Sequence, residues 1–222
     1  MVSLLDIIGP VMVGPSSSHT AGACKLGLIA RCLVGGTPDR AVLELHGSFA
    51  RTGEGHGTDK ALAGGLLGFH PDDERLRQAL EIAEREGLDY RYEKTSLGEE
   101  VHPNSVRITV ERGDRKHVML GASLGAGRIR ISEIDGYVVE VLGNSYTIVL
   151  VAEDVKGSVA RITARLADDG LNIATLTLSR KHRGGDALMV IEVDEPPDVA
   201  VRDHLRAFPW VRWAHRLEKV SA

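Results

Sequence analysis

The feature that most restricts the fold is the order of apolar segments in residues 146–217. Runs of branched apolar residues predict strands, and apolar residues spaced three or four apart predict helices. The predicted elements are, in order, a strand at 146–152, a helix at 157–167, strands at 171–179 and 186–193, a helix at 199–207 and a strand at 211–217. These six elements form a self-contained pattern.

This order is the split βαββαβ pattern of ferredoxin-like domains, so we expect such a domain over residues 146–222. The pattern hosts many functions and by itself assigns none. A boundary is predicted at residues 143–145, where Gly, Asn and Ser follow one another.

Residues 1–143 predict a first domain of mixed helices and strands, so the whole chain is expected to be an α+β protein with an N-terminal mixed α/β substrate-binding domain. Its predicted helices are 3–8, 21–34, 60–67 and 72–86, and its predicted strands are 41–47, 88–94, 106–111, 117–121, 128–134 and 137–142.

Composition excludes two classes of partner. The net charge of −4 gives no electrostatic basis for binding nucleic acid. No apolar run approaches the ~20 residues that span a bilayer, and the start of the chain lacks a signal-peptide pattern, so we expect no membrane partner and a cytoplasmic location. Scarce amide residues and abundant Arg and Glu suggest a thermophilic source.

A first candidate site is the segment 14–20, Gly-Pro-Ser-Ser-Ser-His-Thr, just before the predicted helix at 21–34. Its serines are good N-cap residues. The first turn of the helix would present free N–H groups and the positive end of the helix dipole, which suits a carboxylate. The alternative is a helix cap in a flexible serine-rich loop.

A second candidate is the predicted loop 47–60, which holds four glycines and delivers polar side chains to another helix N-terminus. Those side chains are Thr52, His56, Thr58, Asp59 and Lys60. Thr58 or Asp59 is expected to cap the helix at 60–67. Strand-to-helix connections usually have ~2–6 residues, so this longer one suggests function, although it could be a plain connection with incidental polar residues.

Four segments together closely resemble the beta chain of bacterial iron–sulfur L-serine dehydratase (L-serine ammonia-lyase). They are 14–20, 47–60, 102–105 (His-Pro-Asn-Ser) and the small-residue loop 121–127. Residues 146–222 resemble an ACT domain, with Gly157 after the first strand and Asn172-Ile173 at the second.

The resemblance implies an activity that deaminates L-serine to pyruvate and ammonia, within amino-acid catabolism and gluconeogenesis. A base removes the Cα proton, and one iron of a 4Fe–4S cluster acts as the Lewis acid for the leaving hydroxide. Clusters are normally held by three or four thiolates, and this chain has only Cys24 and Cys32 on one predicted helix. We therefore expect no metal site here, a cluster held by cysteines of a separate alpha chain, and homodimerisation through this chain.

The resemblance also suggests roles for individual residues. His56 is the expected general base, and Asp59 is expected to orient its ring or a neighbouring one. The residues expected to bind substrate are Ser16, Ser17, Ser18, His19, Thr20, Thr58, Asn104 and Ser123. His56 could instead be a loop histidine bonded to backbone.

A second function stays open. The first domain also resembles the allosteric substrate-binding domain of some phosphoglycerate dehydrogenases. The alternative is therefore a serine-sensing regulatory module with no chemistry of its own.

Overall fold

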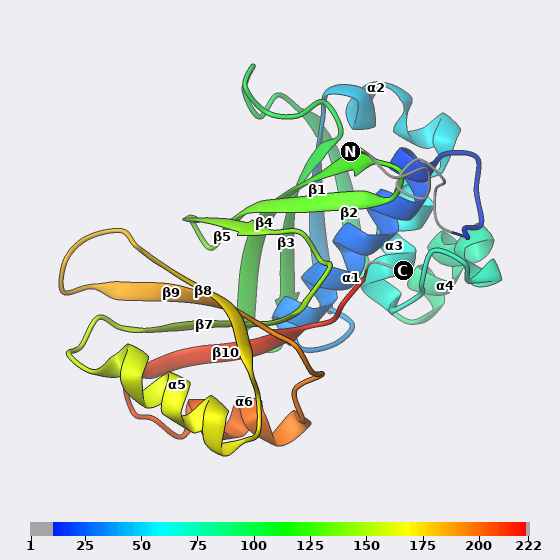
Figure 1. The fold of residues 1–222 in the computed structure, drawn as a ribbon. Helices are drawn as coiled ribbons and strands as arrows, with labels where there is room; N and C mark the ends of the chain where they lie inside the picture. The colour runs from blue at the N-terminus through cyan, green and yellow to red at the C-terminus, as the bar shows by residue number, and fades with distance from the viewer. Residues whose placement is uncertain (1–10, 221–222) are drawn as a thin grey trace, which may run out of the picture.

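The computed structural model describes residues 11–220 apart from the side chain of Glu54, and the predicted helix at 3–8 lies outside this range. The chain forms two sheets, with strand orders β2-β1-β3-β4-β5-β6 and β10-β7-β9-β8 (Figure 1). The strands of the first sheet are β1 (Arg40–His46), β2 (Asp89–Thr95), β3 (Ser105–Arg112), β4 (Arg115–Gly125), β5 (Arg128–Ile134) and β6 (Tyr137–Val141). Those of the second are β7 (Tyr146–Glu153), β8 (Ile173–Arg180), β9 (Asp186–Val193) and β10 (Val211–Leu217).

The first sheet is mixed, and its one parallel pair explains where the helices lie. Strand β1 pairs in parallel with β2 and antiparallel with β3. A parallel pair needs a crossover connection. That crossover contains α2 (Gly47–His56), α3 (Thr58–Leu67), the 3₁₀ helix η3 (Glu74–Gln78) and α4 (Ala79–Arg85). Helix α2 therefore starts directly at the carboxyl end of β1.

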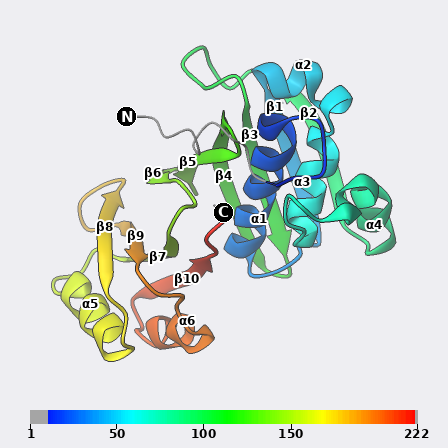
Figure 2. The same cartoon turned by 45° about the vertical axis from the view of Figure 1, so that its right-hand side comes forward.

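The long N-terminal helix packs between the sheet and α3 (Figures 1 and 2). It begins as a π-helical turn, η2 (Ser17–Gly22), and continues as α1 (Ala23–Val34). Almost every residue of α1 is buried, because α3 covers one side and strands β3 and β4 the other. The apolar side chains of α1 and α3 and of the inward face of the sheet form one core.

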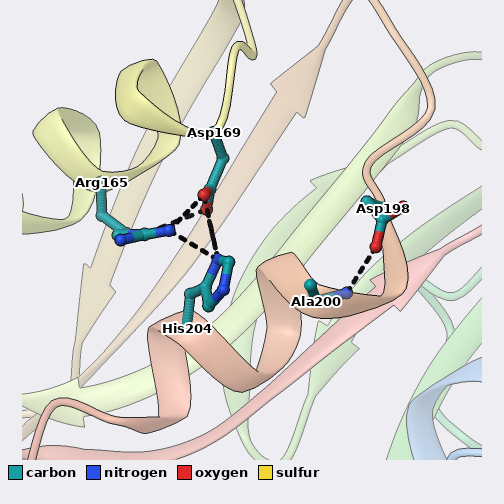
Figure 3. A network of polar contacts seen from close by, with 5 residues as sticks. All are labelled: Arg165, Asp169, Asp198, Ala200 and His204. Atoms are coloured by element: carbon teal, nitrogen blue, oxygen red, sulfur yellow. Dashed lines mark hydrogen bonds and ion pairs between the residues drawn. The ribbon is translucent and has the colours of Figure 1, made fainter.

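The second part has the predicted order of strands and helices, which confirms the ferredoxin-like pattern. Helices α5 (Ser158–Asp168) and α6 (Val199–Arg206) lie on the face of its sheet that points away from the first sheet (Figures 1 and 2). Asp169 joins the two helices, since its carboxylate accepts from Arg165 and contacts His204 Nδ1 at 3.0 Å (Figure 3). Asp198 caps α6 by accepting from the N–H of Ala200.

The two faces of the second sheet belong to different cores. Along β7, Ile148 and Leu150 pack under α5 and α6, whereas Val149 and Val151 join the core of the first part. This alternation follows from the two-residue period of a strand. Strand β7 is thus buried on both faces, whereas β8 at the edge of the sheet is largely exposed.

Four predictions about secondary structure were wrong. The predicted loop 47–60 is largely the helix α2, and the N-cap of α3 is Gly57 rather than Thr58 or Asp59. The predicted loop 121–127 is strand as far as Gly125. The predicted helix 72–86 is divided into η3 and α4. Burial against the neighbouring elements outweighs the local preference of glycine for loops.

Candidate functional site

The serine-rich segment supplies the predicted N-cap, but the helical turn begins at Ser17 rather than at residue 21. Ser16 is the N-cap, with extended backbone, and its hydroxyl accepts the N–H of His19 at 3.1 Å. The turn that follows, η2, is π-helical. Such turns are rare and often occur at functional sites. The capped turn directs His19 and Thr20 toward α2, where Thr20 Oγ1 donates to the carbonyl of His56 at 3.3 Å.

Helix α2 brings three polar side chains to His19 at a spacing of four residues. Ser48, Thr52 and His56 lie on one face of the helix, because residues four apart are neighbours there. Thr52 Oγ1 lies 3.1 Å and Ser48 Oγ 3.3 Å from His19 Nε2. The ring centroids of His19 and His56 are 5.1 Å apart. The two segments that the sequence analysis selected thus meet in one cluster.

Hydrogen bonding determines which nitrogen of His56 carries the proton. His56 Nδ1 lies 2.9 Å from the carbonyl oxygen of Thr52. A carbonyl can only accept, so Nδ1 carries the hydrogen and the neutral ring keeps its lone pair on Nε2. The His56 side chain is exposed. This nitrogen is therefore free to act as a base.

The same reasoning makes His19 a donor. Thr52 Oγ1 donates its hydrogen to the Ser48 carbonyl at 2.9 Å and can only accept from His19 Nε2. Burial lowers the pKa of His19, and the neighbouring His56 lowers it further. A neutral His19 with its hydrogen on Nε2 satisfies both conditions.

A cavity of about 540 Å³ opens beside this cluster. His56, Thr20 and Gly14 line it, together with the exposed cations Lys60 and Arg77. Arg77 also pairs with Glu74 at 3.1 Å. The cavity is large enough for a small metabolite, and its positive side chains favour an anionic group.

Of the predicted site residues, only Thr20 and His56 line this cavity. Ser16, Ser17, Ser18 and His19 belong to the adjoining turn and its cap, and the other four lie on α3, before β3 and on β4. Thr58 and Ser123 are fully buried, and neither hydroxyl has a partner. Asn104 precedes β3, where its carbonyl accepts from the N–H of Ser123. Asp59 lines a different cavity, and the ring of His56 is oriented by the Thr52 carbonyl instead of by Asp59.

Sequence patterns did not indicate Ser48 or Arg77, and they gave no specific role for Thr52 or Lys60. Ser48 and Thr52 have a detectable signal, because they precede His56 by eight and four residues. That signal is visible only if 47–56 is taken as a helix, and the glycines in this segment argued against one.

Between residues 11 and 220, no group of three or more His, Cys, Asp or Glu side chains is arranged to hold a metal ion. No helix in the same range is long and apolar enough to cross a membrane. Both cysteines are free thiols on α1.

Comparison with known sequences identifies the family. The model of the serine dehydratase beta chain family matches residues 3–133, and the ACT domain model matches residues 146–209. The chain belongs to the serine dehydratase beta chain family. Its second sheet and the helices α5 and α6 are an ACT domain.

Two relatives of this family cover nearly the whole chain. A probable L-serine dehydratase beta chain of Bacillus subtilis is 42% identical over 207 residues, which is 93% of this chain and 94% of the relative. The L-serine dehydratase beta chain of Peptoniphilus asaccharolyticus is 40% identical over 87% of this chain and 88% of its own length.

A more distant relative belongs to another enzyme. The D-3-phosphoglycerate dehydrogenase of Methanocaldococcus jannaschii is 28% identical over 54% of this chain, and the match spans 22% of that dehydrogenase. The two serine dehydratase beta chains therefore match a larger fraction of this chain, and at higher identity.

Proposed function

We propose that this chain is the beta subunit of an L-serine ammonia-lyase and that His56 is its general base. The observation that carries the proposal is the geometry of His56. Its Nδ1 is fixed by the Thr52 carbonyl, which leaves the basic nitrogen free on a ring that lines the cavity.

His56 would remove the Cα proton of L-serine. Abstraction near neutral pH suits an imidazole, whose ordinary pKa is about 6.5. The proton moves to Nε2 while the Cα electrons form the double bond of aminoacrylate and the β-hydroxyl departs. Aminoacrylate then takes up water to give pyruvate and ammonia.

The cations of the cavity would hold the substrate carboxylate. Lys60 and Arg77 are the positively charged side chains that line it with His56. The serine turn helps to hold His56 in place. The Ser16 hydroxyl accepts from the N–H of His19, and Thr20 donates to the carbonyl of His56. Ser17 and Ser18 belong to the same turn and stay predicted substrate contacts.

The thiols of this chain do not fit the ligand set of an iron–sulfur cluster. Cys24 Sγ is buried and donates to the Phe69 carbonyl at 3.1 Å, and burial raises the pKa of both cysteines. Cluster ligands are thiolates. We therefore place the 4Fe–4S cluster, which would supply the Lewis acid for the leaving hydroxyl, on a separate alpha chain. Homodimerisation of this chain stays a prediction.

The test is His56→Gln in the complex purified anaerobically with the cysteine-rich alpha chain. Loss of a general base should lower kcat for pyruvate release by about 10²–10⁴-fold. The control is His70→Gln, because His70 is exposed and does not line the cavity. Full turnover by His56→Gln would refute the base assignment, and a lower melting temperature would show a structural effect instead.

The relation to a phosphoglycerate dehydrogenase favours the second candidate, a serine-sensing module. Here the chain would bind L-serine without turnover, whatever partner is added. Pyruvate release only from the mixture of both chains would eliminate this candidate.

A further inference from the structure

A second cavity, of about 330 Å³, lies on the other side of α2 and α3. It is bounded by α2, the start of α3, α4 and the strands β1 and β2, and no residue lines both this cavity and the one at His56. We name it the β2 cavity. The proposed reaction uses none of its side chains.

One part of the β2 cavity is apolar. Leu45, Phe49 and Leu80 line it, and Phe49 is fully buried. Tyr90 and Tyr92 add two rings from β2, in an edge-to-face arrangement with centroids 5.4 Å apart. Such a wall matches a branched aliphatic or an aromatic group.

Three charged side chains line the same cavity, Asp59, Arg51 and Lys94, and Asp59 and Arg51 are not paired with each other. Asp59 Oδ1 is buried and has no hydrogen-bond partner. The hydroxyl of Tyr92 does not serve the carboxylate, since it donates to the Asp59 backbone carbonyl at 2.6 Å. Arg51, on α2, forms no ion pair with Asp59 or with another side chain in the described part of the chain.

An unpartnered buried carboxylate oxygen is costly, so its presence beside a cavity calls for an explanation. A cation alone would neutralise Asp59 but would be repelled by the positive side chains of Arg51 and Lys94. An inorganic anion would meet the reverse problem. A zwitterion offers a partner to Asp59 and to Arg51 at once.

We propose that the β2 cavity binds a free α-amino acid with an apolar side chain. The ammonium group of the ligand would donate to Asp59, its carboxylate would accept from Arg51, and its side chain would pack against Phe49, Leu80 and Tyr90. The ligand would join α2 to α3, and α2 carries Thr52 and His56.

The first experiment is calorimetric titration of the full chain with L-leucine. Leucine has no β-hydroxyl, so it tests the β2 cavity without being a substrate of the proposed reaction. Two analogues separate the charges: 4-methylpentanoate lacks the amine, and 3-methylbutylamine lacks the carboxylate. Glycine lacks the apolar group. We expect L-leucine to bind and each of the three to bind at least about tenfold more weakly.

Matched variants locate the site. Asp59→Asn and Arg51→Gln should each weaken L-leucine binding by about tenfold or more, because each removes a charge-assisted hydrogen bond. Asp72→Asn and Arg91→Gln remove the same charges from exposed positions outside the cavity and should change nothing. His56→Ala should also bind L-leucine normally.

Three results would overturn the proposal. They are absence of binding at millimolar L-leucine, equal affinity in Asp59→Asn and Asp72→Asn, and loss of binding in His56→Ala. If Asp59→Asn fails to fold, the comparison of L-leucine with 4-methylpentanoate still tests the proposal. Equal affinity for both would mean that the ligand's ammonium group, and therefore the Asp59 carboxylate, has no role in binding.

Discussion

His19 and His56 have different roles although their rings are neighbours. Two protonated rings side by side would repel each other, and burial already lowers the pKa of His19. Neutral His19 donates to Thr52, and the carbonyl of that residue orients His56. In the proposed reaction His19 would therefore position its neighbours, and His56, whose ring is the more exposed of the two, would be the base.

The two cysteines should be unreactive in the folded chain. Burial raises the pKa of Cys24 to about 12 and that of Cys32 to about 11. At pH 8 the thiolate fraction of Cys24 is then roughly a thousandfold below that of an ordinary cysteine. We expect no reaction with a disulfide reagent within minutes under native conditions and two reacting thiols after unfolding. Rapid labelling of native protein would contradict the burial of α1.

At the scale of elements, α2 shows what sequence patterns could not predict. The four glycines at 47, 53, 55 and 57 predict a loop, yet only Gly47 and Gly57 have positive φ values, and both lie at the ends of the segment. Gly53 and Gly55 lie inside the helix. The β-strands, by contrast, were predicted well, because alternating burial leaves a clear two-residue pattern in β3 and β6.

The candidate site shows the same division between local and tertiary information. His56, His19 and Thr20 were found because their segments combine caps, glycines and titratable groups. The directions of the Thr58 and Asp59 side chains could not be predicted from the sequence, because they depend on how α3 is rotated about its axis relative to α2. Residues one apart on a helix face different sides, so an error in the helix start misplaces both.

The contact between α1 and α3 depends on two glycines that let the helices approach. A Cβ atom on Gly65 would lie 2.1 Å from the carbonyl oxygen of Cys24, and one on Gly27 2.5 Å from that of Leu62. These neighbours are backbone and cannot move aside. Gly65→Ala should lower the free energy of unfolding by about 1–3 kcal/mol, measured by urea denaturation.

Gly55→Ala is the matched control for this prediction, because no atom lies within 4 Å of a Cβ placed there. In a helix it should be neutral or stabilising by up to about 1 kcal/mol. Equal effects of the two substitutions would mean that close helix packing is not what Gly65 provides.

At the scale of the whole molecule, the ACT domain and the first sheet share a buried interface. His117 on β4 is fixed by Asp135, with Nδ1 and Oδ2 2.8 Å apart. Its ring meets those of Trp213 and His215 on β10, with centroids 4.9 and 5.1 Å away. Nε2 of His215 is buried without a partner. The interface therefore encloses His215, whose charged form is disfavoured by burial.

This interface should make stability depend on pH. Burial lowers the pKa of His215 to about 3, and electrostatic interactions with His117, Arg115, Arg206 and Arg202 act in the same direction. Unfolded His215 binds a proton below about pH 6.5. Between these values the unfolded state holds more protons, so stability falls as the pH falls, by about 1.4 kcal/mol per unit.

Urea unfolding of the wild type and His215→Phe between pH 5 and pH 8 measures this dependence. The variant cannot titrate at this position, so its stability should fall less steeply below about pH 6.5. His70→Gln, which removes an exposed histidine, should keep the wild-type slope. The ion pair of Asp169 does not interfere, because Arg165 and His204 lower the pKa of that carboxyl and its contribution is lost only in stronger acid. If the stability of His215→Phe falls with pH as steeply as that of the wild type, protonation of His215 is not the cause of the pH dependence.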